Sequence, residues 1–95
     1  MDVKKEFTEY TLIDMMFEGS SIDSFKSLWD KDNDAEKWSE LLHMCYWEQS
    51  YERAGGDEGY LDNPPINAER LNYLEELIKF LEESGIKALN DSPRT

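Results

Sequence analysis

The stretch NAERLNYLEELIKFLEESGI, residues 67–86, decides the fold, because it has every signal of a complete amphipathic helix. Asn67 is a favourable N-cap, and Gly85 followed by Ile86 is typical of a left-handed helix stop with a hydrophobic contact. Apolar residues recur within the stretch at the spacing of one helix face. These residues are Leu71, Leu74, Leu77, Ile78 and Leu81, with Tyr73 and Phe80 at the edge. The stretch therefore predicts a helix that buries one side in a core.

Working outward from this helix, the N-terminal part of the chain predicts a first helix from about Thr8 to Glu18. Thr8 can act as its N-cap, and Gly19 can end it in the left-handed conformation. The apolar residues of this segment are dense but poorly periodic. Residues 6–13 also suit a strand, since Thr, Tyr and Ile favour extended structure, so a minor N-terminal strand is the alternative.

A second helix is expected from Ser21 to about Asp30. Ser20, with Asp23 three residues later, resembles a capping box with a shorter acid. Apolar residues then fall on one face at helical spacing. They are Ile22, Phe25, Leu28 and Trp29. An acidic turn follows and separates this helix from the next.

The third helix is expected from Asp34, its N-cap, to Gly55, and it is apolar on two sides. At about 100° per residue, two stripes lie roughly opposite each other. One consists of Trp38, Leu41, Leu42 and Cys45, and the other of Met44, Trp47 and Tyr51. Either this helix is central to the bundle, or the second stripe contacts another molecule, because exposed aromatic patches mark interfaces.

Residues 55–66 predict a long loop, since three glycines and the pair Pro64-Pro65 disfavour regular structure. We expect Tyr60 and Leu61 to hold this loop against the core. The whole chain, residues 1–95, is then a single small all-α domain of four helices, with a frayed tail at residues 90–95.

The charge of the chain is strongly negative, with 22 Asp and Glu against 10 Lys and Arg and a net charge of −12. A small domain usually carries a net charge of magnitude about 2–8. Disorder does not explain the excess, because 39% hydrophobic and 13% aromatic residues are enough to build a core. A negative surface attracts basic partners and repels nucleic acid and anionic lipid. We therefore expect a basic protein as partner, with no direct binding of nucleic acid and no membrane.

The acids concentrate in residues 57–83, which hold eight acids and two bases. On the predicted last helix, three acids follow one line at i, i+7 and i+14, and two more follow the next line. Helices in water usually gain from mixed-sign pairs, so this one-sided charge predicts a partner-binding surface. Its residues are Asp57, Glu58, Asp62, Glu69, Glu75, Glu76, Glu82 and Glu83.

The sequence contains no convincing pair of a catalytic nucleophile and a general base. His43 and Cys45 stand two positions apart on one helix, so their side chains diverge by about 200°. Cys45 lies in the core stripe, where a free cysteine behaves as a small hydrophobe. Glu40 and His43 are three apart and are interpreted as a surface pair. We expect no catalytic residues and no enzyme activity.

The acidic turn before the third helix matches only the first positions of a calcium-binding loop. Asp30, Asp32 and Asp34 alternate correctly, but Ala35 stands where glycine is required and Leu41 where the bidentate glutamate is required. A capping turn is the better interpretation, so we expect no metal and no cofactor.

The chain shows no targeting signal. No apolar run follows the N-terminal lysines, and no stretch approaches the roughly 18 apolar residues of a membrane span. A single cysteine fits a reducing compartment. These features predict a cytoplasmic location, which for a phage-encoded protein means the host cytoplasm.

Three function classes remain. The first is a non-enzymatic DNA mimic whose carboxylates replace phosphates on the basic surface of a nuclease or another DNA- or RNA-handling protein. Small phage-encoded antagonists of restriction and CRISPR nucleases form such a class, and this chain resembles them in size and charge. The second is an immunity protein that neutralises a basic nuclease toxin. The third is an adaptor or subunit that uses the stripe of Met44, Trp47 and Tyr51, which also predicts a homodimer.

Overall fold

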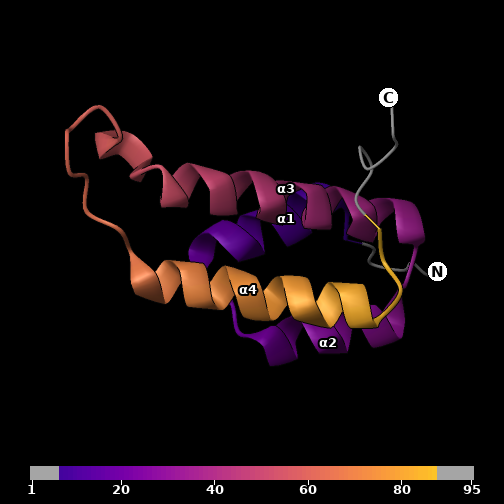
Figure 1. Ribbon diagram of the computed structural model, residues 1–95. Helices are drawn as coiled ribbons and strands as arrows, with labels where there is room; N and C mark the ends of the chain where they lie inside the picture. The colour runs from indigo at the N-terminus through magenta and orange to yellow at the C-terminus, as the bar shows by residue number, and fades with distance from the viewer. Residues whose placement is uncertain (1–6, 88–95) are drawn as a thin grey trace.

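The computed structural model describes residues 7–87, and within them the chain forms four α-helices and no strand. The helices are α1 (Glu9–Glu18), α2 (Ile22–Lys31), α3 (Ala35–Arg53) and α4 (Ala68–Glu83), with a short 3-10 helix, η1 (Gly56–Glu58), after α3 (Figure 1). The predicted all-α four-helix domain is confirmed. The alternative strand is wrong for the described residues, because α1 already begins at Glu9. The expected frayed tail lies outside them.

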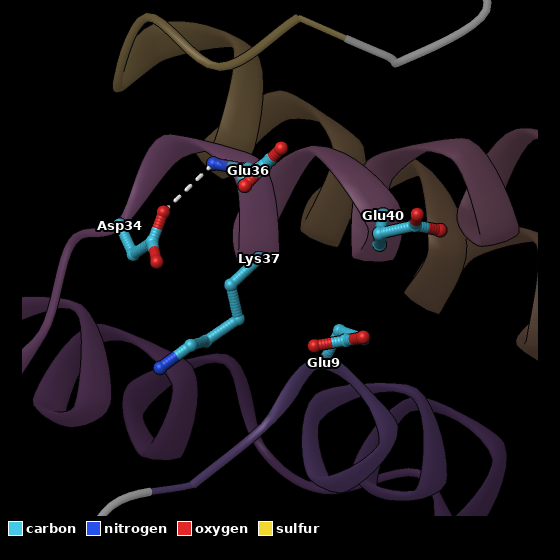
Figure 2. Close-up of a pocket in the computed structure, with 5 residues that line it drawn as sticks. All are labelled: Glu9, Asp34, Glu36, Lys37 and Glu40. Atoms are coloured by element: carbon cyan, nitrogen blue, oxygen red, sulfur yellow. Dashed lines mark hydrogen bonds between the residues drawn. The ribbon is translucent and has the colours of Figure 1, made fainter.

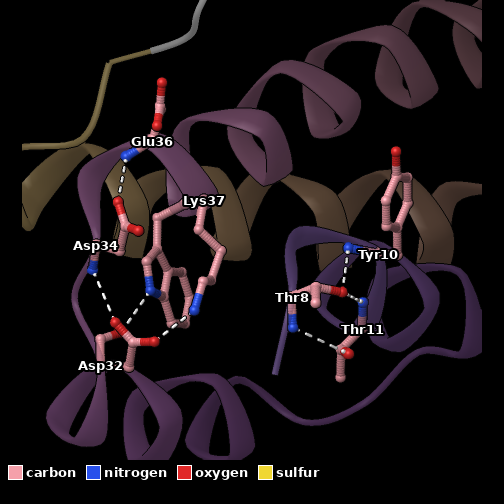
Figure 3. A network of polar contacts seen from close by, with 8 residues as sticks. Thr8, Tyr10, Thr11, Asp32, Asp34, Glu36 and Lys37 are labelled. Carbon is pink, nitrogen blue, oxygen red and sulfur yellow. Dashed lines mark hydrogen bonds and ion pairs between the residues drawn. The ribbon is translucent and has the colours of Figure 1, made fainter. Parts of the chain in front are cut away.

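The helix ends follow from local side-chain caps. Thr8 accepts hydrogen bonds from the first turn of α1, and its own N–H bonds Thr11 Oγ1, which completes a capping box. Asp34 caps α3 through the Glu36 N–H at 3.0 Å, and Asn67 caps α4. The caps of α1 and α3 are shown in Figure 3. These three N-caps were predicted correctly.

Two further helix ends test the sequence predictions. The Ile86 N–H donates to the Leu81 carbonyl at 3.0 Å, so α4 ends in the predicted stop after Gly85, whose φ is +90°. The N-cap of α2 is Ser21, which accepts from the Ser24 N–H, so the predicted capping box of Ser20 is wrong. The Ser20 N–H instead bonds the Met15 carbonyl and belongs to the end of α1.

The helices run in alternating directions and pack in pairs (Figure 1). α3 and α4 lie side by side as the long central pair, α1 packs on α3, and α2 packs on α4. The core between them is built from one face of each helix. Its largest fully buried side chains are Trp38, Phe25, Leu12, Met16, Leu41, Leu42, Leu74, Leu77, Leu81 and Cys45.

Trp38 joins three chain segments at one end of the bundle. Its ring meets the rings of Phe7, Trp29 and Phe80 edge to face, at centroid distances of 6.1, 5.2 and 6.5 Å. The indole N–H donates to the Asp32 carbonyl at 2.7 Å. A buried indole thus packs on all sides and keeps its polar atom satisfied, as buried tryptophan requires.

The long loop between α3 and α4 contains the one-turn helix η1, which the expectation of an irregular loop missed. The loop is not held by Tyr60 and Leu61, as predicted, because these side chains are 81% and 42% exposed. Gly55 is buried instead, with Pro64 directly beside it, and Tyr51 donates its hydroxyl hydrogen bond to Asp57. Backbone contact and one side-chain bond therefore shape the loop.

We expect Gly55→Ala to destabilise the domain more than Gly19→Ala. Both glycines have positive φ, +102° and +81°, so each substitution incurs the left-handed cost of about 1–2 kcal/mol. A Cβ on Gly55 would overlap the Pro64 Cβ and lie 2.8 Å from its Cγ, whereas a Cβ on Gly19 meets no atom within 4 Å. Urea unfolding of both variants measures the difference, and equal losses would contradict the close contact with Pro64.

Candidate functional site

The eight acids of the predicted surface are all exposed. Three belong to η1 and the loop, and five project from α4. Asp57 and Glu82 each accept a hydrogen bond from a tyrosine of α3, namely Tyr51 and Tyr46. The acids are therefore placed along one end of the molecule and along the side of α4 that turns away from the core.

Arg70 is one of the two bases in this region, and it turns inward. Its guanidinium lies 3.6 Å from the Glu48 carboxylate and donates a 2.9 Å hydrogen bond to the Met16 carbonyl. Only 15% of its side chain is exposed. The outer side of α4 therefore loses one compensating positive charge to the interior, which strengthens its negative field.

The other base, Lys79, partly compensates the predicted acidic line. It shares a pocket of about 280 Å³ between α2 and α4 with Lys26, and Glu76 and Glu83 line the same pocket. Lys26 of α2 therefore adds a second positive charge beside this line of acids.

The second candidate surface is the aromatic stripe of α3. Trp47 is 52% exposed, and its ring stacks on that of Tyr51 with centroids 5.4 Å apart and planes 10° apart. Met44 packs against the hydrophobic core instead, so the predicted three-residue stripe is reduced to two aromatic rings. α3 is thus covered on one side and keeps an aromatic surface on the other.

The two surfaces meet at Tyr51. Its hydroxyl donates to Asp57, and this bond raises the pKa of Tyr51 to about 12, with desolvation and the charges of Glu48 and Glu52 adding to the shift. The phenol therefore stays neutral at physiological pH and remains a donor. The sequence predicted the acidic loop and the aromatic stripe as two separate surfaces. In the structure, the hydrogen bond between Tyr51 and Asp57 connects them.

The buried pair of Glu48 and Arg70 was not predicted from the sequence. Desolvation raises the pKa of Glu48, and the nearby Arg70 opposes this shift. Tyr73 lies beside Arg70, 5.4 Å from ring to guanidinium, and donates to the Ser20 carbonyl at 2.6 Å. The sequence did contain one signal of this burial, because Glu48 lies three residues after Cys45 and so falls on the core stripe. The cluster links α1, α3 and α4 to the turn before α2.

A shallow pocket of about 310 Å³ opens where α1 meets the start of α3, and Figure 2 shows its lining. The lining residues are Glu9, Asp34, Glu36, Lys37 and Glu40. Lys37 is engaged with its neighbours, since it pairs with Asp32 (Figure 3) and lies 4.3 Å from the Phe7 ring centroid. Asp34 serves as the helix cap described above.

Cys45 and the acidic turn before α3 are the residues that could have supplied a nucleophile or a metal site. Burial raises the pKa of the Cys45 thiol to about 12, so the thiolate needed for nucleophilic attack is not formed near neutral pH. Asp32 and Asp34 are used by Lys37 and by the cap of α3, in agreement with a capping turn. Within residues 7–87 no three His, Cys, Asp or Glu side chains form a metal-binding group.

Comparison with protein family models, with curated proteins and with solved structures gave no match to this chain. Over the described residues, no helix combines the length and the apolar character that a membrane crossing needs. Function is therefore inferred from the residues and their geometry alone.

Proposed function

We propose that this protein is a non-enzymatic inhibitor of the DNA-mimic type. Its acidic face binds the basic nucleic-acid-binding surface of a nuclease or of another DNA- or RNA-handling protein, as phage antirestriction and anti-CRISPR proteins do. The observation that carries the proposal is the exposure of all eight acids of residues 57–83 while Arg70 is withdrawn into the interior.

The dimensions of the acidic face support this proposal. Glu69, Glu76 and Glu83 span 14 residues of helix, or roughly 21 Å at a rise of about 1.5 Å per residue. This length corresponds to about two-thirds of a turn of duplex DNA. A basic groove would gain many modest charge contacts here, and the net charge of −12 would speed the encounter.

In this proposal the protein acts in the cytoplasm, or in the host cytoplasm if it is phage-encoded. It binds neither nucleic acid nor membrane directly and needs no cofactor. An immunity protein that neutralises a basic nuclease toxin would use the same surface and differ only in its target. An adaptor role is favoured by one separate observation, the exposed stack of Trp47 and Tyr51.

Charge reversal tests the acidic face. We expect the triple variant Glu69→Lys, Glu76→Lys and Glu83→Lys to lose affinity for the basic partner and to lose most of the salt dependence of binding. The partner is first isolated from host lysate at low salt and identified by mass spectrometry. Affinity is then measured by titration from low to high salt, and duplex DNA should compete with the protein for the partner.

The matched control reverses three other exposed acids, Asp14, Glu18 and Asp30, which changes the net charge equally. Exposed substitutions of this kind usually change stability by less than about 0.5 kcal/mol each, and circular dichroism verifies the fold. Equal losses in both triple variants would show a general charge effect. Unchanged affinity and salt dependence in the first variant would reduce the acidic face to a solvated helix side.

A further inference from the structure

The stacked rings of Trp47 and Tyr51 form an aromatic platform on the side of α3 opposite to its buried stripe. The stack is offered to solvent, since half of Trp47 is exposed. The edge of the Tyr51 ring lies close to Gly56, where a Cβ in place of the glycine hydrogen would be 3.7 Å from the ring. α1 and α4 both pack on α3. The platform is therefore supported on one side and uncovered on the other.

The surroundings of the platform are negative. Asp57 accepts the hydrogen bond of the Tyr51 hydroxyl, and the Glu52 carboxylate lies beside Gly56, next to the edge of the Tyr51 ring. Glu58 follows Asp57 in η1 and is exposed. An aromatic face attracts cations through its quadrupole, and neighbouring carboxylates add to that attraction.

The charge of the whole chain limits which partner fits this platform. A second copy would bring together two chains that each carry a net charge of −12, and like charges oppose such contacts. A guanidinium group is planar and weakly hydrated, so it stacks on Trp and bonds carboxylates at the same time, which an ammonium group does less well. The platform and its acids therefore match arginine better than lysine.

We propose that the Trp47–Tyr51 platform, with Asp57 at its edge, is the docking surface for an arginine side chain of a basic protein partner. The inference deepens the proposed function, on which it rests for the basic character of the partner. It assigns to α3 a selective contact, while the acidic face of α4 supplies long-range attraction.

Two peptides of equal charge, nona-arginine and nona-lysine, test this assignment. We expect the wild-type protein to bind nona-arginine about two- to fivefold more tightly at moderate salt, the range of an exposed cation–π contact. The variant Trp47→Leu keeps an apolar side chain and removes the best aromatic face, so it should lose most of this preference. Fluorescence anisotropy of labelled peptides gives both affinities. Tyr60→Leu, at an 81% exposed loop aromatic, is the matched control and should keep the preference.

The outcomes separate this inference from the proposed function. The charge-reversed α4 variant should weaken both peptides and keep their ratio. The charge-reversed variant could bind both peptides as tightly as the wild type while Trp47→Leu loses the preference for nona-arginine. That result would contradict the acidic face and support the platform. Equal binding of the two peptides by the wild type, or an unchanged ratio in Trp47→Leu, overturns the platform. A concentration-dependent dimer in sedimentation that Trp47→Leu abolishes also overturns it, by naming a second copy as the occupant.

Discussion

Replacing Trp38 by alanine should lower the free energy of unfolding by about 3–5 kcal/mol. The side chain is fully buried and touches aromatic rings from the segment before α1, from α2 and from α4. Its removal leaves a cavity that three neighbouring rings border, and it also removes the indole N–H that donates to the Asp32 carbonyl. Because small domains have a total stability of about 5–15 kcal/mol, this single change threatens the fold.

Urea unfolding followed by circular dichroism measures the effect. The matched control is Trp47→Ala, the same substitution on the opposite side of the same helix, where half of the side chain is exposed. This control should cost about 1 kcal/mol, mainly through the lost ring stack. Trp38→Phe keeps one aromatic ring but removes the second ring and the indole N–H, so it should give an intermediate loss, and it replaces the alanine variant if that variant does not fold. Similar losses at Trp38 and Trp47 would contradict the role of Trp38 in joining three chain segments within the core.

Replacing Arg70 by alanine should cost about 3–5 kcal/mol at neutral pH, because it leaves the Glu48 carboxylate buried without its cation. The side chain of Glu48 is 8% exposed, and 3.6 Å separates the two charged groups. The Met16 carbonyl at the end of α1 loses the guanidinium donor as well and keeps the hydrogen bond from the Gly19 N–H. Glu48→Gln in the same background should restore part of the loss, because it removes the uncompensated charge.

The pH dependence of this loss has a definite sign. Burial raises the pKa of Glu48 above its ordinary value of 4.5, so protonation of this group favours the folded state. Its stabilising contribution is complete below pH 4.5 and fades as pH rises through the folded pKa. The cost of Arg70→Ala should therefore be smaller at about pH 4 than at about pH 7. A cost that is equal at both pH values would show that Glu48 does not carry the penalty.

The helices and their ends could be predicted from sequence because their determinants are local. Thr8, Asp34 and Asn67 each bond an amide within three residues, so chain position alone identifies them as caps. The failure at Ser20 is also local. Two serines in succession could each begin α2, and the end of α1 decides between them by using the Ser20 N–H.

The exposure of the acids on α4 also followed from helical spacing. The sequence could not show which bases would oppose them. Arg70 and Lys79 stand on the same helix, but one is drawn inward by Glu48 of α3, and the other is joined by Lys26 of α2. These neighbours depend on the rotation and offset of packed helices. In the same way, helical periodicity placed Met44 with Trp47, whereas packing assigned Met44 to the core.

By itself, the sequence determined the number of α-helices, most of their ends, the sides that face the core and the negative character of the surface. Each of these properties arises from residues within about one helical turn or from composition, so no knowledge of distant contacts is needed. Only the tertiary structure decided that Glu48 pairs with Arg70, that Lys26 lies beside Lys79, and that the loop bends back to join Asp57 to Tyr51. Such contacts join side chains from different elements, and their formation depends on how these elements are fitted together around the shared core.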